Sequence, residues 1–285
     1  MPRSTSQRKA RSAAELHPRR QPSAIRDPTR IESTELDAIA SYWARLGVLF
    51  GVKPAEEPVD VELLICDTAR VAPADERLFV CAASWIAQYH AFVNGRRLSA
   101  LAASLDPDAS AVLGALLSFA GEVAGGAPEL QAALARCRPL AKPQPLFTAM
   151  RSMRVLSERV RRHALPVFAA WGLWHDDQTL KPAAIRPVAW LLKRVPELRV
   201  RSLLGPSVEA DLMARALAEE VTVREVARMT LTSYAAVHGA ADRLVWRGLL
   251  VRERVAQSQV LRPTSFASDI LRDLDSLDVR VSRAR

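Results

Sequence analysis

The residues best suited to chemistry by type and spacing form a short polar run, His175-Asp176-Asp177. Adjacent imidazole and carboxylate groups are ligands that divalent metal ions accept. A metal site needs further ligands, and the nearest upstream histidine, His163, belongs to a separate arginine-rich stretch. We therefore interpret the run as a polar loop after Trp174, and we predict no metal ion and no catalytic residue there.

Other signatures of enzymes are also missing from the sequence. It contains no lysine-bearing phosphate loop, no Gly-x-Gly-x-x-Gly run and no Gly-x-Ser-x-Gly elbow. Cys66, Cys81 and Cys137 lie far apart and form no Cys-x-x-Cys pair, which favours reduced thiols in a cytoplasmic protein. We predict a protein that is not an enzyme and binds no cofactor.

The elements that would position functional residues are predicted to be mainly helical. Ala, Leu, Val and Arg are common, and apolar residues recur at helical spacing through residues 31–138, which we expect to form a helical domain. Within it, Asn94-Gly95 is expected to end a helix in the left-handed conformation. No apolar run approaches the 18 or so residues of a membrane span, so we expect no membrane contact.

Charge is distributed unevenly along the chain, whose formal net charge is +9. Residues 1–30 hold eight basic and two acidic residues and predict a disordered basic arm, whereas residues 31–135 hold six basic and fourteen acidic residues. Residues 136–206 hold fourteen basic and four acidic residues, and residues 207–263 eight and seven. Most of the positive charge therefore lies before the C-terminal part.

The prolines at 139, 143 and 145 mark the start of a basic helical region, 139–205. Leu146 to about Trp171 is expected to be one long basic helix, bent near Pro166. Its cluster of arginines predicts either a contact with nucleic acid or an acidic partner, or simply a solvated helix face. This secondary basic patch consists of Arg151, Arg154, Arg159, Arg161 and Arg162.

Residues 206–264 have the pattern of three helices followed by a hairpin. Ser207 is placed to cap the first helix, and Thr222 and Glu225 form a capping box for the second. Thr232 is expected to cap the third helix, which Gly248 ends. Two alternating stretches then predict a pair of strands joined by a turn at Gln257-Ser258. Residues 265–285 are expected to form a last helix and a tail.

The stretch Leu231–Val255 resembles the recognition helix and wing of winged helix-turn-helix regulators of the MarR and ArsR type, over about a fifth of the chain. The shared residues are Val237, Arg243, Leu244, Gly248, Leu249, Leu250, Arg252 and Arg254. The resemblance implies a fold with a C-terminal winged helix whose third helix enters the major groove of double-stranded DNA. By position, the implied DNA-contacting residues are Ser233, Tyr234, His238, Arg243, Arg247, Arg252, Arg254, Gln257, Ser258, Gln259 and Arg262.

The segment before this region is similar to the lead-in of winged-helix regulators encoded beside nucleotidyltransferase toxins. The similar residues are Arg199-x-Arg201-Ser-Leu-Leu-Gly205. This second resemblance implies a regulator in a mobile-element or defence locus.

The third helix also departs from what reading a DNA sequence requires. Ala235, Ala236 and Gly239 offer no hydrogen bonds to base edges, and Trp246 falls on the outer face by helical phase. An exposed tryptophan is typical of an interface. Two hypotheses follow: a DNA-binding transcriptional regulator, acting as a homodimer on a two-fold operator, or an assembly subunit that docks a protein partner through Trp246.

Overall fold

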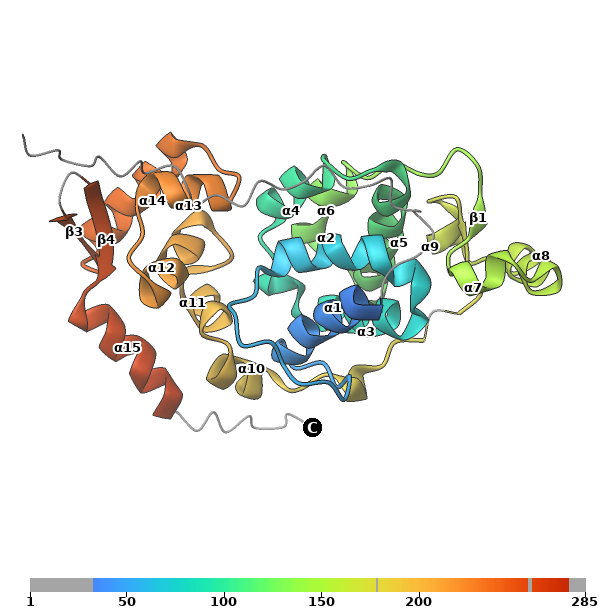
Figure 1. Cartoon of the computed structure of the whole chain (residues 1–285), viewed down its shortest axis with the longest axis horizontal. Helices are drawn as coiled ribbons and strands as arrows, with labels where there is room; N and C mark the ends of the chain where they lie inside the picture. The colour runs from blue at the N-terminus through green and yellow to red at the C-terminus, as the bar shows by residue number, and fades with distance from the viewer. Residues whose placement is uncertain (1–32, 178, 256–257, 277–285) are drawn as a thin grey trace, which may run out of the picture. The chain divides into compact units, whose positions relative to one another are not determined.

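Helices form most of the structure, as the apolar spacing predicts (Figure 1). The structure is a computed structural model that describes residues 33–177, 179–255 and 258–276, the last five of these by their backbone alone. The first helices are α1 (Ser33–Arg45), α2 (Val61–Val71), α3 (Glu76–Tyr89), α4 (Gly95–Ala102), α5 (Pro107–Val123) and α6 (Pro128–Leu134), with short 3-10 turns at Ala72–Ala74 and His90–Phe92.

Aspartate side chains begin three of these helices. Asp60, Asp75 and Asp106 accept a hydrogen bond from the backbone N–H three residues on, which satisfies one of the free donors of α2, α3 and α5. The three helices pack against one another. The core between them and α1 holds Trp43 and Trp85, whose indole N–H groups donate to Thr68 Oγ1 and the Leu46 carbonyl.

The expectation that Asn94-Gly95 ends a helix is wrong. Asn94 instead begins α4, where its side chain accepts a hydrogen bond from the backbone N–H of Arg97. Gly95 is required by close packing, because a Cβ at this position would lie 2.1 Å from the carbonyl oxygen of Glu129 in α6. The same residue pair therefore marks a helix start and a tight helix–helix approach.

The single long basic helix expected from Leu146 to Trp171 is also wrong. The segment forms three short helices, α7 (Thr148–Arg151), α8 (Arg154–Arg162) and α9 (Pro166–Ala169). Met153 and Leu165 adopt extended backbone just before α8 and α9, and Leu165 is forced toward this conformation by Pro166. Two short parallel strands, β1 (Gln144–Pro145) and β2 (Leu173–Trp174), hold the two ends of the segment together.

The C-terminal elements are α10 (Val188–Arg194), α11 (Pro196–Leu204), α12 (Val208–Ala218), α13 (Val223–Met229), α14 (Tyr234–Trp246), β3 (Leu250–Val255), β4 (Ser258–Pro263) and α15 (Ser265–Ser276), preceded by a 3-10 turn at Pro182–Ala184. Residues of α11 to α14, both strands and α15 share one apolar core, in which Val226, Val237 and Leu244 are fully buried. These helices and the β3–β4 strands therefore pack around a single apolar core.

The predicted capping pattern is largely confirmed. Ser207 caps α12, and Thr222 and Glu225 form the reciprocal capping box of α13. The expectation for Thr232 is wrong, because Ser233 caps α14 and the Thr232 hydroxyl donates to the Thr230 carbonyl. Between α13 and α14 the chain turns through Leu231, at a positive φ of 52°.

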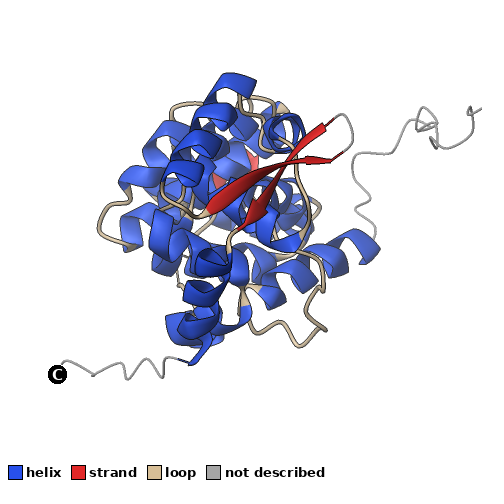
Figure 2. Ribbon diagram, turned by 90° about the vertical axis from the view of Figure 1, so that its left-hand side faces the viewer, coloured by secondary structure: helices blue, strands red, loops and turns tan. Residues whose placement is uncertain are grey.

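The two predicted strands pair as an antiparallel hairpin after α14 (Figure 2). Gly248, at a φ of 72°, reverses the chain between α14 and β3. Ser258 was expected in the turn but is the first residue of β4, opposite Val255. Val221, between α12 and α13, also forms an isolated antiparallel β-bridge with Leu261 of β4. This bridge holds the hairpin against the helices. None of the described helices is both long and apolar enough to cross a membrane.

Candidate nucleic-acid interface

The outward surface of α14 is built by helical spacing. Val237, Ala240, Ala241 and Leu244 face the core, so Ala235, Gly239, Asp242 and Trp246 fall on the opposite side. Of the predicted contact residues at the start of α14, Ser233 uses its hydroxyl to accept from the backbone N–H of Ala236. Tyr234 is 56% exposed, and its ring contacts that of His238.

Two arginines predicted to meet phosphate share one carboxylate. Arg243 and Arg247 project from one side of α14 and both form ion pairs with Glu209 of α12. The Glu209 side chain is only 15% exposed, whereas the two arginines are 56% and 45% exposed. The guanidinium groups are therefore held next to each other at the surface, with part of their charge already compensated.

A second acidic residue neutralises the junction between α14 and the hairpin. Asp242 forms ion pairs with Arg252 of β3 and with Nδ1 of His238 one turn earlier in α14. The hydrogen bond from Arg252 lowers the pKa of Asp242 below its ordinary value, and the charge of Arg252 and contact with His238 act in the same direction. Asp242 thus orients both the Arg252 and the His238 side chains on the side of α14 that faces solvent.

The hairpin places its basic residues on two faces. Side chains alternate along a strand, so Arg252 and Arg254 share the face of the buried Leu250, and Gln259 lies opposite Arg254 on that face. Among the described residues, Arg254 has no ion-pair partner. Arg262 lies on the other face, where it pairs with Glu220 and Glu253. Ser258 is exposed, and Gln257 lies outside the described residues.

Two further exposed arginines lie on α13, which packs against α14, and were not among the predicted contacts. Arg224 and Arg228 lie one turn apart on α13 and are both exposed. Their spacing of four residues, opposite the buried Val226, could have identified them from the sequence. The prediction overlooked them because the resemblance covers α14 and the hairpin and begins after α13.

Trp246 is 87% exposed, which confirms the prediction that it lies on the outer face. Leu231, in the turn before α14, is 60% exposed. The outward side of this helix therefore combines small residues and large apolar ones with the charged residues along its flank. Such a surface suits contact with the phosphate backbone of DNA, or with a protein partner, better than recognition of bases through hydrogen bonds.

The secondary basic patch is only partly a cationic surface. Arg151 donates to the carbonyls of Pro145 and Leu146, and burial lowers its pKa. On α8, Arg161 and Arg162 both pair with Glu158, and their hydrogen bonds lower the pKa of that carboxyl to about 2.

The other two arginines of the patch differ from each other. Arg159 pairs with Asp176, whereas Arg154 is exposed at the start of α8. Most arginines of the patch therefore form ion pairs with carboxylates.

The polar loop expected after Trp174 is corrected at its first residue. His175 is 2% exposed and lies against the rings of Phe147 and Phe168. Burial lowers its pKa, and Glu76, Asp176 and Asp177 act in the opposite direction. In the part of the chain that the structure describes, no cluster of three or more His, Cys, Asp or Glu residues could hold a metal ion.

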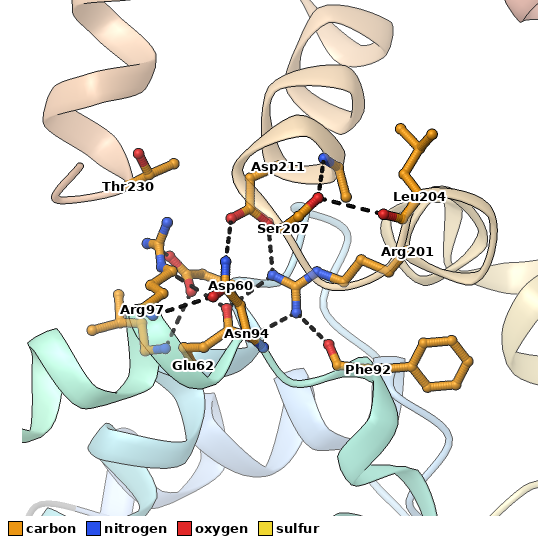
Figure 3. Close-up of polar contacts among 12 residues, drawn as sticks. Asp60, Glu62, Phe92, Asn94, Arg97, Arg201, Leu204, Ser207, Asp211 and Thr230 are labelled. Carbon is orange, nitrogen blue, oxygen red and sulfur yellow. Dashed lines mark hydrogen bonds and ion pairs between the residues drawn. The ribbon is translucent and has the colours of Figure 1, made fainter. Parts of the chain in front are cut away.

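A buried charge cluster joins the C-terminal elements to the N-terminal helices (Figure 3). Arg201 of α11 donates to both oxygens of Glu62 in α2, at 2.7 and 2.9 Å, and to Asp211 of α12 at 2.8 Å. Asn94 Nδ2 also donates to Asp211. Burial alone disfavours a charged guanidinium, but the two carboxylates outweigh it and raise the pKa of Arg201.

No protein-family model matches the chain, and neither the curated proteins nor the solved structures contain a match. The function is therefore inferred from the residues and geometry described above.

Proposed function

We propose that α12, α13, α14 and the β3–β4 hairpin form a winged helix, and that the protein is a DNA-binding regulator of transcription. The observation that carries this proposal is the order of three helices and an antiparallel hairpin around one core. The capped, short α13 and the tight turn at Leu231 support a helix-turn-helix. The resemblance of Leu231–Val255 to winged-helix regulators points the same way.

In this proposal α14 approaches the major groove, while Arg252 and Arg254 of the hairpin reach phosphates. The ion pairs on this surface do not oppose such a role. Exposed arginine–carboxylate pairs contribute only about 0–1 kcal/mol, and the Asp242 side chain is 51% exposed, so a phosphate can replace its carboxylate on Arg252 at little cost. Phosphate contacts position a protein on DNA without reading its sequence.

The surface favours a hold on the backbone over recognition of particular bases. Ala235 and Gly239 occupy the outward side of α14, and neither offers a bidentate hydrogen bond to a base. Arg224 and Arg228 of α13 add exposed cations beside α14. We therefore expect modest sequence preference and strong dependence on salt. A homodimer on a two-fold site would double the number of contacts.

The experiment is a titration of the full chain with a duplex at several salt concentrations. Changing both Arg252 and Arg254 to Ala should weaken binding, and the slope of log K against log salt should become shallower by about 0.9 for each lost phosphate contact. The matched control is Lys193→Ala with Arg194→Ala, which removes two adjacent exposed cations from α10. Binding that is absent at low salt, or that does not depend on salt, would contradict the proposal.

A second candidate function is docking of a protein partner, and one observation favours it. Trp246 is 87% exposed, and large aromatic side chains are the usual anchors of interfaces. In this case the winged helix of an assembly subunit would bind a partner through α14, and duplex titration would show no salt-sensitive binding. The proposal places the protein in a mobile-element or defence locus only on the similarity of residues 199–205.

A further inference from the structure

A cavity of about 190 Å³ lies where the N-terminal helices meet α11, α12 and α13. Its walls come from α1, α4, the segment before α2 and these three C-terminal helices. This volume is smaller than the roughly 300–1,000 Å³ of pockets for drug-sized ligands. The cavity has room for about six waters. It would therefore hold only a small molecule, of about six heavy atoms or a few more.

The wall of this cavity has an unusual share of unsatisfied polar atoms. Six buried side-chain polar atoms in the described residues lack a hydrogen bond, and three of them belong to lining residues: Arg45 Nε, Arg97 Nε and Glu197 Oε2. Buried polar groups are nearly always paired, so such a concentration needs an explanation. The Arg97 side chain is 9% exposed, and its Nε lies 3.9 Å from Glu62 Oε2, an ion pair without a hydrogen bond, so the buried N–H remains unsatisfied within the described part of the chain.

One lining cation is available to a ligand. Arg215 of α12 is half-buried at the cavity, and among the described residues its guanidinium has neither a hydrogen-bond nor an ion-pair partner. The neighbouring Arg201 differs, because Glu62 and Asp211 already occupy it. A guanidinium without a partner in a partly enclosed site favours a carboxylate, which it can bind through two parallel hydrogen bonds.

Carboxylates and apolar groups complete the lining. Asp60 and Glu197 line the same cavity, where Asp60 pairs with Arg97 and Glu197 pairs with Arg45 through one oxygen, which leaves Glu197 Oε2 without a hydrogen bond among the described residues. Burial raises the pKa of Asp60 even though Arg97 acts in the opposite direction. A positive group placed nearby would relieve this penalty. Leu217 and Met229 supply apolar surface next to the charges. The lining therefore holds three arginine–carboxylate pairs, the guanidinium of Arg215, which has no partner among the described residues, and a short apolar wall within one small volume.

We propose that this cavity binds a small amino-acid-like zwitterion. Its carboxylate pairs with the guanidinium of Arg215, its ammonium group faces Asp60 and Glu197, and a short apolar side chain packs against Leu217 and Met229. The carboxylate of the ligand would supply the partner that Arg215 lacks, its ammonium group would donate to the unsatisfied Glu197 Oε2, and its size matches the cavity. This inference does not depend on DNA binding.

The test is thermal unfolding of the full chain with a panel of the standard L-amino acids, followed by calorimetric titration of each one that raises Tm. At least one amino acid with a short apolar side chain should raise Tm in a saturable manner. Arg215→Gln should raise its Kd about tenfold to a hundredfold, since a hydrogen bond to a charged group is lost. The control Arg96→Gln removes an exposed arginine of α4 that does not line the cavity, and it should leave the Kd unchanged.

Two further arms make the test independent of how well one variant folds. Ala214→Leu adds bulk to the cavity wall and should also weaken binding. The deaminated acid and the decarboxylated amine of the same ligand should each bind at least about tenfold more weakly than the amino acid. The proposal is overturned if no amino acid raises Tm, if either analogue binds as tightly, or if Arg215→Gln binds as well as the parent protein.

The position of the cavity also suggests what the ligand would change. Met229 and Thr230, which line it, are the last residues before the turn into α14, and the Met229 carbonyl accepts from Arg97. A ligand there would bear on the orientation of α14, and this clause rests on the proposed function. The thermal measurement needs no DNA, so failure of the ligand site and failure of duplex binding are distinguishable.

Discussion

Arginine–carboxylate contacts occur in two regions of this molecule, one buried and one at the surface, and they have different roles in each. In the buried cluster, the side chains of Arg201, Glu62 and Asp211 are 7%, 0% and 9% exposed. On the surface of the C-terminal helices, Arg243 and Arg247 pair with Glu209 while remaining about half exposed. The chemical groups are the same, and Glu209 is itself only 15% exposed, so the two regions differ mainly in the exposure of their arginines.

The difference follows from the cost of removing charge from water. A buried pair is held by strong attraction at low dielectric, but loss of one partner leaves the other unpaired and costs about 3–5 kcal/mol. An exposed pair is screened by solvent and contributes about 0–1 kcal/mol. The buried cluster therefore fixes the C-terminal elements against α2, whereas the proposed function requires the surface arginines to exchange carboxylate for phosphate.

The largest expected effect comes from breaking the buried cluster. Glu62→Gln should lower the free energy of unfolding by about 3–5 kcal/mol, because the charge of Arg201 then loses its closest partner. Denaturant unfolding of the full chain measures this loss. The surface control is Glu158→Gln, which removes the partner of Arg161 and Arg162 and should change stability far less. Equal effects of the two variants would contradict the distinction.

Local parts of the fold could be predicted from the sequence because local residues decide them. The caps at Ser207 and Thr222, the reversal at Gly248 and the outward position of Trp246 all follow from neighbours within one or two turns. The same reasoning missed Ser233 as the cap of α14 by one residue. A shift of this size is common when two adjacent residues are both good caps.

Contacts between distant residues could not be predicted. Arg201 and Glu62 are 139 positions apart, and nothing near either residue indicates the other. Gly95 was assigned to a helix end because its need, close approach of the Glu129 carbonyl, arises from another helix. The sequence analysis named the arginines of the hairpin and of α14 as contact residues, but it did not identify Glu209 and Asp242 as their ion-pair partners. Tertiary packing determines these features, and the local patterns of a single sequence do not indicate which distant residues come into contact.

Histidines offer a second contrast between buried and exposed charge. Burial lowers the pKa of His175, so the unfolded chain binds a proton more readily than the folded protein. Stability should therefore be present above about pH 6.5 and be lost as pH falls below it, by about 1.4 kcal/mol for each pKa unit between the two states. Melting temperatures measured from pH 7.5 to 5 test this, with His175→Phe expected to flatten the profile.

The control for this pH profile is an exposed histidine. His238 is 42% exposed in its side chain and pairs with Asp242, so His238→Gln should leave the loss of stability below about pH 6.5 in place. A profile that is unchanged by His175→Phe and flattened by His238→Gln would assign the pH dependence to the surface instead.

Releasing a surface pair should have a smaller effect, and in the opposite sense for DNA. Glu209→Gln frees Arg243 and Arg247, so it should tighten duplex binding about two- to fivefold while lowering the free energy of unfolding by less than about 1 kcal/mol. Duplex titration and denaturant unfolding of the same variant give both numbers. Glu219→Gln is the control, since it removes one exposed negative charge from the end of α12. Equal tightening by both variants would reduce the effect to net charge.

The smallest expected effect is that of Trp246→Ala, and it separates the two candidate functions. The side chain is 87% exposed, so its removal should change the free energy of unfolding by no more than about 0.5 kcal/mol. If Arg252 and Arg254 hold the duplex, DNA affinity should also stay the same, because Arg252 is oriented by Asp242 and the uncharged indole of Trp246 contributes no phosphate contact. Sedimentation of the variant in parallel shows whether Trp246 supports self-association. Loss of duplex binding with the oligomeric state unchanged would place Trp246 in the DNA contact itself. The outward side of α14 and its arginine-bearing flank would then form one DNA-binding surface.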